Sequence, residues 1–102
     1  MKLIWTDYAL SDLDAIHEYI ARDSAVYASR FLGRLVRAAE ILEKYPEFGP
    51  VVPQFAGKQI RQLLFHNYRI LYRIDVDRIS IVTVVHVGRD LDLLEAKPWD
   101  VS

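Results

Sequence analysis

Residues 60–87 read IRQLLFHNYRILYRIDVDRISIVTVVHV, and this stretch decides the fold. It contains three apolar runs rich in Ile, Val, Tyr and Phe, at 60–65, 68–74 and 78–87. The separations between the runs are short enough for hairpins, so the pattern predicts three consecutive antiparallel strands. The last run is apolar on both faces, as a central strand covered on both sides would be.

A helical hairpin is predicted before these strands. Residues 2–5 read as a short strand, and Thr6 can cap a helix whose inner stripe is Ala9, Leu13, Ile16 and Ile20. The other side of this helix is expected to be a solvated acidic face, made of Asp12, Asp14, His17 and Glu18.

A second helix begins after the break at Arg22-Asp23-Ser24, where Ser24 can act as the N-cap. It is expected to run to about Tyr45, because Pro46 cannot continue a helix. Gly33 lies inside it and is predicted to allow close approach of another backbone, which would offset its low helix propensity.

These elements predict an α+β fold of order βααβββ, with a helical hairpin packed on a mainly antiparallel sheet and one domain over 1–102. Residues 46–57 hold three of the four prolines and are expected to form an irregular loop. The segment 90–102 shows no clear periodicity and receives no assignment.

The composition excludes several classes of function. There is no cysteine, so thiol chemistry and thiolate zinc sites are excluded. The three histidines lie far apart in sequence, and no cofactor motif occurs, so we expect neither metal nor cofactor. A net charge of -1 argues against direct DNA binding by this chain alone. No signal peptide or membrane anchor is recognisable, and we expect a cytoplasmic protein.

Charge is unevenly distributed along the chain. Between Pro50 and Ile74 there is no Asp or Glu, while four cations fall in this window: Lys58, Arg61, Arg69 and Arg73. Alternation along a strand puts Arg69 and Arg73 on one face, so we expect arginines to line a sheet surface that the helices leave open. Such a surface suits a polyanion or an acidic protein segment, although solvated arginines can also simply protect a sheet. His86 and Arg89 could join the cluster.

Cleavage of RNA through its 2′-hydroxyl needs a base, an acid and cations around the phosphorane. The cations are present, but a clear acid–base pair is not. Asp75 and Asp77 belong to a predicted hairpin turn. We therefore expect a binding protein, and leave the question of enzymatic activity open.

A set of residues spread over nearly the whole chain resembles the RelE/ParE toxin superfamily. The set comprises Ile4-Trp5-Thr6, Ala9, Asp12-Leu13, Ile16, Tyr19-Ile20, Pro46, Gly49, Arg61, Tyr68-Arg69-Ile70, Tyr72-Arg73, His86 and Arg89-Asp90. The resemblance implies a toxin of a type II toxin-antitoxin system, of the kind linked to plasmid stabilisation. It also implies a ParD-like antitoxin that forms a hetero-oligomer with this chain, through a helix in an apolar groove beside the hairpin and an extended segment at a sheet edge.

The superfamily has two branches, which differ in target. ParE-like toxins inhibit DNA gyrase, and RelE-like toxins cut messenger RNA on the ribosome. The late Tyr expected of a RelE-like site is missing, and a near-neutral charge suits a ribosome binder poorly, so the ParE-like branch is favoured. The partner-binding residues are then Arg61, Arg69, Arg73, Arg89 and Trp99, although Trp99 could instead pack the tail onto the core.

Two alternatives stay open. In a RelE-like endoribonuclease the catalytic face would consist of Lys58, Arg61, Arg69, Arg73 and His86. A degenerate member would bind its antitoxin without being toxic.

Overall fold

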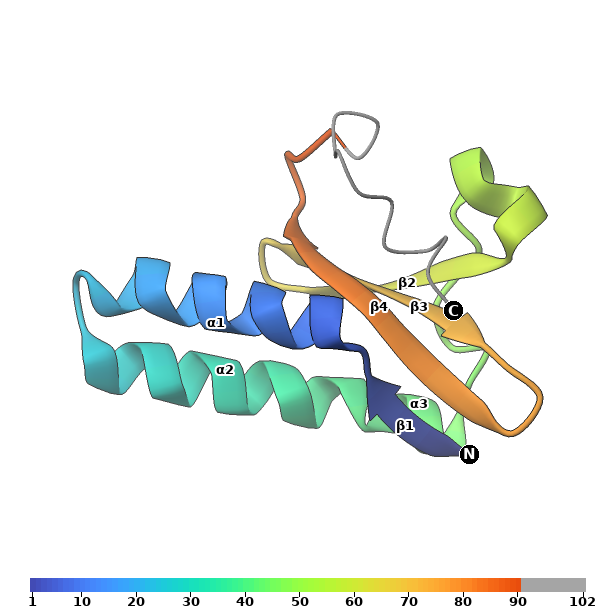
Figure 1. The fold of residues 1–102 in the computed structure, drawn as a ribbon, viewed down its shortest axis with the longest axis horizontal. Coiled ribbons are helices and arrows are strands. Elements are labelled where there is room, and N and C mark those ends of the chain that lie inside the picture. Colours follow the sequence, from blue (N-terminus) through green and yellow to red (C-terminus); the bar gives the residue numbers. More distant parts are fainter. Residues whose placement is uncertain (91–102) are drawn as a thin grey trace.

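The computed structural model of this 102-residue chain describes residues 1–90. The elements follow the order β1 (Lys2–Trp5), α1 (Asp7–Ala21), α2 (Ala25–Ala39), α3 (Ile41–Lys44), η1 (Pro53–Lys58), β2 (Ile60–Phe65), β3 (Tyr68–Ile74) and β4 (Arg78–His86). Figure 1 shows the α1–α2 hairpin beside the sheet, with its tip extending well beyond the strands. The α+β class and the βααβββ order are confirmed.

The sheet has four strands in the order β1-β4-β3-β2. β1 pairs with β4 in parallel, and the other two pairings are antiparallel. β4 is central and buried from Ile79 to Val85, as its two-sided apolar pattern predicts. It ends at His86, one residue earlier than expected.

A β-bulge interrupts the pairing of β3 with β4. Leu71 lies opposite Thr83, but Tyr72 lies opposite Ile81, so Val82 is an extra residue in β4. Such a bulge re-aims neighbouring side chains. Here the Thr83 hydroxyl is directed towards α1, where it donates to the carboxylate of Asp12.

Both predicted helix caps are confirmed. The Thr6 hydroxyl accepts from the Ala9 amide at 3.2 Å, and Ser24 accepts from Tyr27 at 3.1 Å. The second helix is not continuous to Tyr45, since α2 ends at Ala39 and α3 is a separate short turn. The Glu40 amide bonds to the carbonyl three residues earlier, which tightens the backbone there. Within residues 1–90, no helix is long and apolar enough to cross a membrane.

The expected close approach at Gly33 is wrong. A Cβ built there would meet nothing nearer than the guanidinium of Arg37, at 3.5 Å. The close approach occurs instead at Gly49, where a Cβ would lie 2.2 Å from the Gln62 carbonyl oxygen. Sequence alone identifies a glycine but cannot tell which one faces another segment.

The sheet is covered on both faces. Ala9, Ile16, Phe31 and Leu35 of the helices pack on one face together with Ile70, Tyr72, Ile79, Ile81 and Val84. On the other face lies a second cluster, made of Val52, Phe55, Ile60, Leu71, Val82 and Val85. Two members of this cluster, Val52 and Phe55, come from the predicted irregular loop, where the short η1 turns begin at Pro53. The centre of the second face is therefore buried, contrary to the expectation of an open surface.

Candidate functional site

The four predicted cations do not share one surface. In the register of β2 and β3, Arg61 lies opposite Tyr72, whose ring belongs to the helix-side core. Arg69 and Arg73 alternate with Ile70 and Tyr72, so they belong to the opposite face. The expectation that all the arginines line one sheet face is thus wrong for Arg61.

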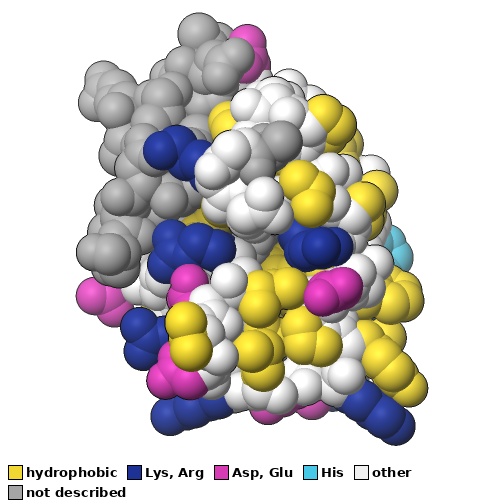
Figure 2. Space-filling model, turned by 90° about the vertical axis from the view of Figure 1, so that its right-hand side faces the viewer, with side chains coloured by type: hydrophobic (Ala, Val, Ile, Leu, Met, Phe, Trp, Pro, Cys, Tyr) yellow, Lys and Arg dark blue, Asp and Glu magenta, His cyan; other side chains and the backbone are white. Residues whose placement is uncertain are grey.

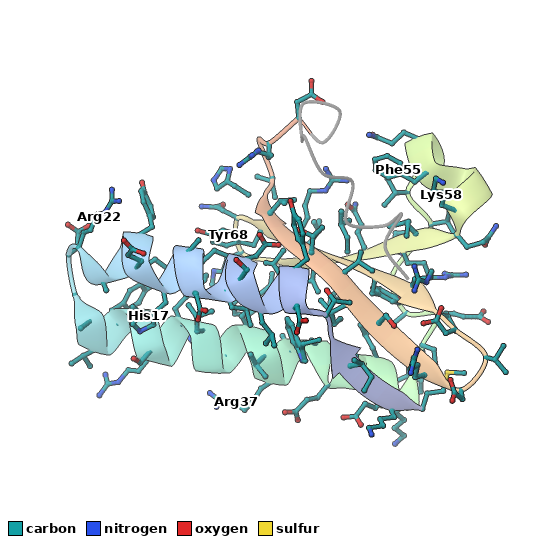
Figure 3. The ribbon with its side chains drawn as sticks, viewed as in Figure 1. His17, Arg22, Arg37, Phe55, Lys58 and Tyr68 are labelled. Carbon is teal, nitrogen blue, oxygen red and sulfur yellow. The ribbon has the colours of Figure 1, made fainter. Side chains whose placement is uncertain are left out.

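Each of these arginines has a partner within the chain. Their donor–acceptor pairs are Arg61 Nη1 to the Gly49 carbonyl, Arg69 Nε to Gln62 Oε1, and Arg73 Nε to Asp75 Oδ1, all at 2.8 Å. All three side chains are half-buried. Lys58 is exposed on η1 (Figure 3). These hydrogen bonds therefore hold the loop to β2, through Arg61, and neighbouring parts of the sheet to one another, through Arg69 and Arg73.

Asp75 is the partner of Arg73, and it also accepts a hydrogen bond from Ser80. Burial raises the pKa of its carboxyl, but hydrogen bonds from Arg73 and Ser80 and the charges of Arg73 and Arg78 outweigh burial, so the pKa lies below its ordinary value. Asp75 thus stays ionised through the neutral range. Arg73 is held by a charged partner rather than being presented freely.

A cleft of about 630 Å³ opens between α1 and the end of β4. Its walls carry aromatic, polar and charged side chains, which include Tyr8, Asp12, Tyr19, Asn67, Tyr68, His86 and Arg89. The His86 and Tyr68 rings meet edge to face, with their centroids 5.8 Å apart. His86 and Arg89, two predicted site residues, are therefore brought together here. Trp99 lies outside the described residues.

Asp12 is held in this cleft and is not part of a solvated face. Its Oδ2 accepts from the Thr83 hydroxyl and from the Val84 amide, the latter at 3.0 Å. Burial raises the pKa of Asp12, and these two hydrogen bonds and the Arg89 charge only partly oppose that effect.

Of the other three residues of the expected acidic face, two are exposed to solvent and one lies between the helices. Asp14 and Glu18 are exposed as expected. His17 lies between the helices, where its Nε2 is 3.1 Å from the Ser29 hydroxyl. Helical spacing alone could have indicated the position of Asp12, because it is three residues from Ala9 and four from Ile16.

The set predicted for a RelE-like site does not converge within residues 1–90. Arg61 and His86 share the helix-side face, but they are two strands apart and about four residues apart along the strands, which is roughly 16 Å. Arg69 and Arg73 face the opposite side of the sheet. These cations and His86 cannot surround a single phosphate in this arrangement.

An apolar groove, missed by the sequence reasoning, runs from the start of the chain and the end of α3, past Phe48, to the outer strand β2. Two adjoining hollows of about 490 and 270 Å³ share Phe48, and their other apolar walls include Met1, Tyr45, Pro46, Ile74, Pro50 and Leu64. We call this surface the edge groove. Tyr45, Phe48 and Leu64 are each more than half exposed. Figure 2 shows hydrophobic side chains gathered at this end of the molecule, flanked by both basic and acidic side chains.

The free backbone of β2 runs along the edge groove. The Val52 amide bonds to the Ile60 carbonyl at 2.8 Å, and the Gln62 amide bonds to the Pro50 carbonyl at 3.1 Å, so the loop covers the first half of the strand. Leu64 is the next residue of β2 whose backbone N–H and C=O point to the outer edge of the strand. In the described part of the chain, no segment pairs with β2 at this position. An unpaired strand edge is a template for an added strand.

A family model described as ParE toxin of type II toxin-antitoxin system, parDE, matches residues 3–91. Toxin RelE2 of Caulobacter vibrioides is 36% identical over 89 residues, which cover 86% of this chain and 97% of that protein. The solved chromosomal ParDE system of P. aeruginosa contains a chain that matches with a TM-score of 0.73 at 24% identity. That match covers 84% of this chain and 95% of the other, and it shows a shared fold.

Proposed function

We propose that this chain, which belongs to the ParE toxin family of type II toxin-antitoxin systems, is neutralised by a cognate antitoxin and inhibits DNA gyrase when free. We favour gyrase over messenger RNA as the target because the cations proposed for an RNA-cleaving site do not lie together. Arg61 and His86 lie far apart on one face of the sheet, and Arg69 and Arg73 lie on the other. This arrangement favours a toxin that acts by contact over one that cleaves a phosphodiester.

The edge groove is the proposed seat of an extended antitoxin segment. A strand added at Leu64 would gain main-chain hydrogen bonds, and apolar side chains of the antitoxin would cover Phe48 and Tyr45. Arg69 lies opposite Leu64 in the neighbouring strand and is half-exposed, so an acidic antitoxin residue could reach it. The ParD-like, acidic antitoxin implied by the family suits this surface.

The antitoxin contact is tested with Leu64→Lys, which puts a charge on the apolar edge without altering the β2–β3 ladder. We expect antitoxin affinity to fall on the order of tenfold or more, as for a central apolar contact. Val76→Lys is the matched control, because Val76 is 99% exposed in the β3–β4 turn, away from β2. Equal affinities for the two variants would remove the edge groove from the interface.

The cleft beside β4 is the proposed contact with the target. Arg89, His86 and Tyr19 are among its lining residues, and all three are exposed. Arg89→Glu is expected to abolish growth arrest on induction. Arg78→Glu, a charge reversal of the exposed arginine that begins β4, is expected to leave growth arrest unchanged.

A ribosome-dependent endoribonuclease is the second candidate, and the cleft is what favours it. His86, Tyr68 and Asp12 are titratable groups that line one hollow beside the cation Arg89. Such a set could serve acid–base chemistry on a bound RNA. A curated relative named RelE2 also keeps this candidate open.

One experiment separates these functions. The chain is induced without its antitoxin, and trapped gyrase–DNA breaks are measured beside transcript cleavage. Gyrase-dependent breaks with intact transcripts support the proposal. Fresh cuts in translated messenger RNA with gyrase unaffected would replace it with the second candidate, and normal growth at full expression would indicate a non-toxic, antitoxin-binding member.

A further inference from the structure

The outer face of the helical hairpin carries charges of opposite sign on its two helices. On α1, Asp7, Asp14 and Glu18 recur at seven- and four-residue spacing, which places them along one line of the helix. This line lies on the opposite side of α1 from the buried residues Ala9 and Ile16. It forms an acidic ridge that faces away from the sheet.

α2 carries a matching basic ridge. Arg30, Arg34 and Arg37 follow one another at four- and three-residue spacing and are all exposed. They lie away from the buried stripe that contains Phe31 and Leu35. No Asp or Glu occurs within α2, so the ridge is uniformly positive.

The two ridges do not neutralise each other within the chain. Across the described residues, no ion pair joins any of these six side chains to another group, although α1 and α2 are neighbours. By contrast, the arginines Arg61, Arg69 and Arg73 of the sheet all have partners. The hairpin therefore presents an acidic and a basic row to solvent, side by side.

Between the ridges runs a shallow apolar groove of about 470 Å³, which we call the hairpin groove. Its floor and walls include Leu13, His17, Leu32, Gly33 and Val36. Gly33 has no side chain to fill the groove, and only the Arg37 guanidinium lies within 4 Å of the place where its Cβ would be. In Figure 3, His17 lies between the helices and Arg37 projects from α2 away from the sheet.

We infer that the outer face of the hairpin is an interface for a second copy of this chain. A two-fold axis along the hairpin groove would lay α1 of each copy over α2 of the other and would preserve the height of every residue along the helices. Asp14 and Glu18 of one copy would then face the Arg30–Arg34 region of its partner, and the same contacts would repeat by symmetry. Helices packed at about 8–10 Å would close the groove between the two copies.

Charge pattern is the reason for choosing a second copy over other partners. An acidic segment would match α2 but would be repelled by α1, and a basic segment would show the reverse. A second copy matches both ridges at once. Both ridges lie on the sides of α1 and α2 opposite their buried residues, so the sheets of the two copies would lie on the outer sides of the dimer.

The test uses the full chain, purified away from its antitoxin, and sedimentation equilibrium. We expect a dimer whose dissociation constant rises at least about tenfold between about 50 and 500 mM salt, since exposed charge pairs are screened. A chain that stays monomeric at low salt and high micromolar concentration would overturn the inference.

Charge reversal then tests the geometry. Asp14→Lys with Glu18→Lys makes both ridges basic, and Arg30→Glu with Arg34→Glu makes both acidic, so each double variant is expected to be monomeric. Mixed in equal amounts, the two variants are expected to form a heterodimer, because every reversed charge again faces its opposite. A matched control, Lys2→Glu with Lys44→Glu, changes the net charge as the second variant does, but on other elements, and should dimerise normally.

Circular dichroism checks that each variant is folded. Failure of the mixture to associate would refute the arrangement, as would dimers that persist in either double variant. Loss of antitoxin binding in the Arg30→Glu/Arg34→Glu variant, together with a monomeric wild-type chain, would assign the basic ridge to the antitoxin instead.

Discussion

Tyr72→Phe tests which contacts hold the Pro46–Gly49 turn, a wall of the edge groove, against the sheet. Tyr72 is fully buried, and its hydroxyl accepts from the Gly49 amide at 2.9 Å and donates to the Pro46 carbonyl at 2.8 Å. Burial raises the pKa of Tyr72, so the hydroxyl stays protonated and able to donate. One side chain thus bonds to both ends of the Pro46–Gly49 turn.

The expected loss follows from these two hydrogen bonds. Removing the oxygen leaves the buried Gly49 amide without its partner, at about 1–3 kcal/mol, whereas water can partly replace the bond to the Pro46 carbonyl. We expect the free energy of unfolding to fall by about 2 kcal/mol. For a chain of this size, that corresponds to a melting temperature lower by roughly 10 °C.

The measurement is urea and thermal unfolding followed by circular dichroism, with Tyr45→Phe as the control. The Tyr45 side chain is about half exposed, so its variant should stay within about 0.5 kcal/mol of the wild type. Amide exchange should also quicken at Gly49 and Val52 in the Tyr72 variant, because the turn is held less firmly. If Tyr72→Phe is as stable as the Tyr45 control, then Arg61 and the packing of Phe55, rather than Tyr72, fasten this loop.

Three further predictions follow from particular contacts. Gly33→Ala should raise the free energy of unfolding by up to about 1 kcal/mol in urea titrations, since the new methyl group meets only a flexible guanidinium; a loss of stability would show a closer neighbour. Gly49→Ala should cost more than about 3 kcal/mol, because its Cβ would overlap the Gln62 carbonyl, and a variant of normal melting temperature would contradict that geometry. Asp12→Asn should be at least as stable as the wild type at neutral pH and should lose a pH dependence. The folded-state pKa of Asp12 is raised, so its contribution to stability is complete below its ordinary value of 3.8 and is lost as pH rises through the folded-state pKa. Stability curves that run parallel from acid to neutral pH for the two proteins would exclude a raised pKa.

Local sequence signals predicted the elements well. β2 and β3 begin and end where the apolar runs do, and both helices start at the predicted caps, Thr6 and Ser24. These features depend on residues within a few positions of one another, through side-chain alternation and side-chain-to-backbone hydrogen bonds. The chain itself therefore determines them, before any long-range contact forms.

The candidate site required relations between distant residues. Alternation within β3 correctly grouped Arg69 with Arg73, but the face of Arg61 depends on the register that puts it opposite Tyr72. Helical spacing puts Asp12 beside the buried stripe of α1, but its hydrogen-bond partner Thr83 lies 71 residues away and is turned towards it by a bulge. No local pattern carries either fact.

By itself, the sequence determined the order of the main strands and helices, the limits of β2 and β3, the helix caps at Thr6 and Ser24, and the absence of thiol chemistry. The tertiary structure alone decided that Val52 and Phe55 of the loop pack on the second face of the sheet, and that the arginines are dispersed and bonded within the chain. The physical reason is range. Periodicity and capping act over a few residues, whereas strand register, the bulge and the packing of a loop on a sheet are fixed by contacts between segments far apart in the chain.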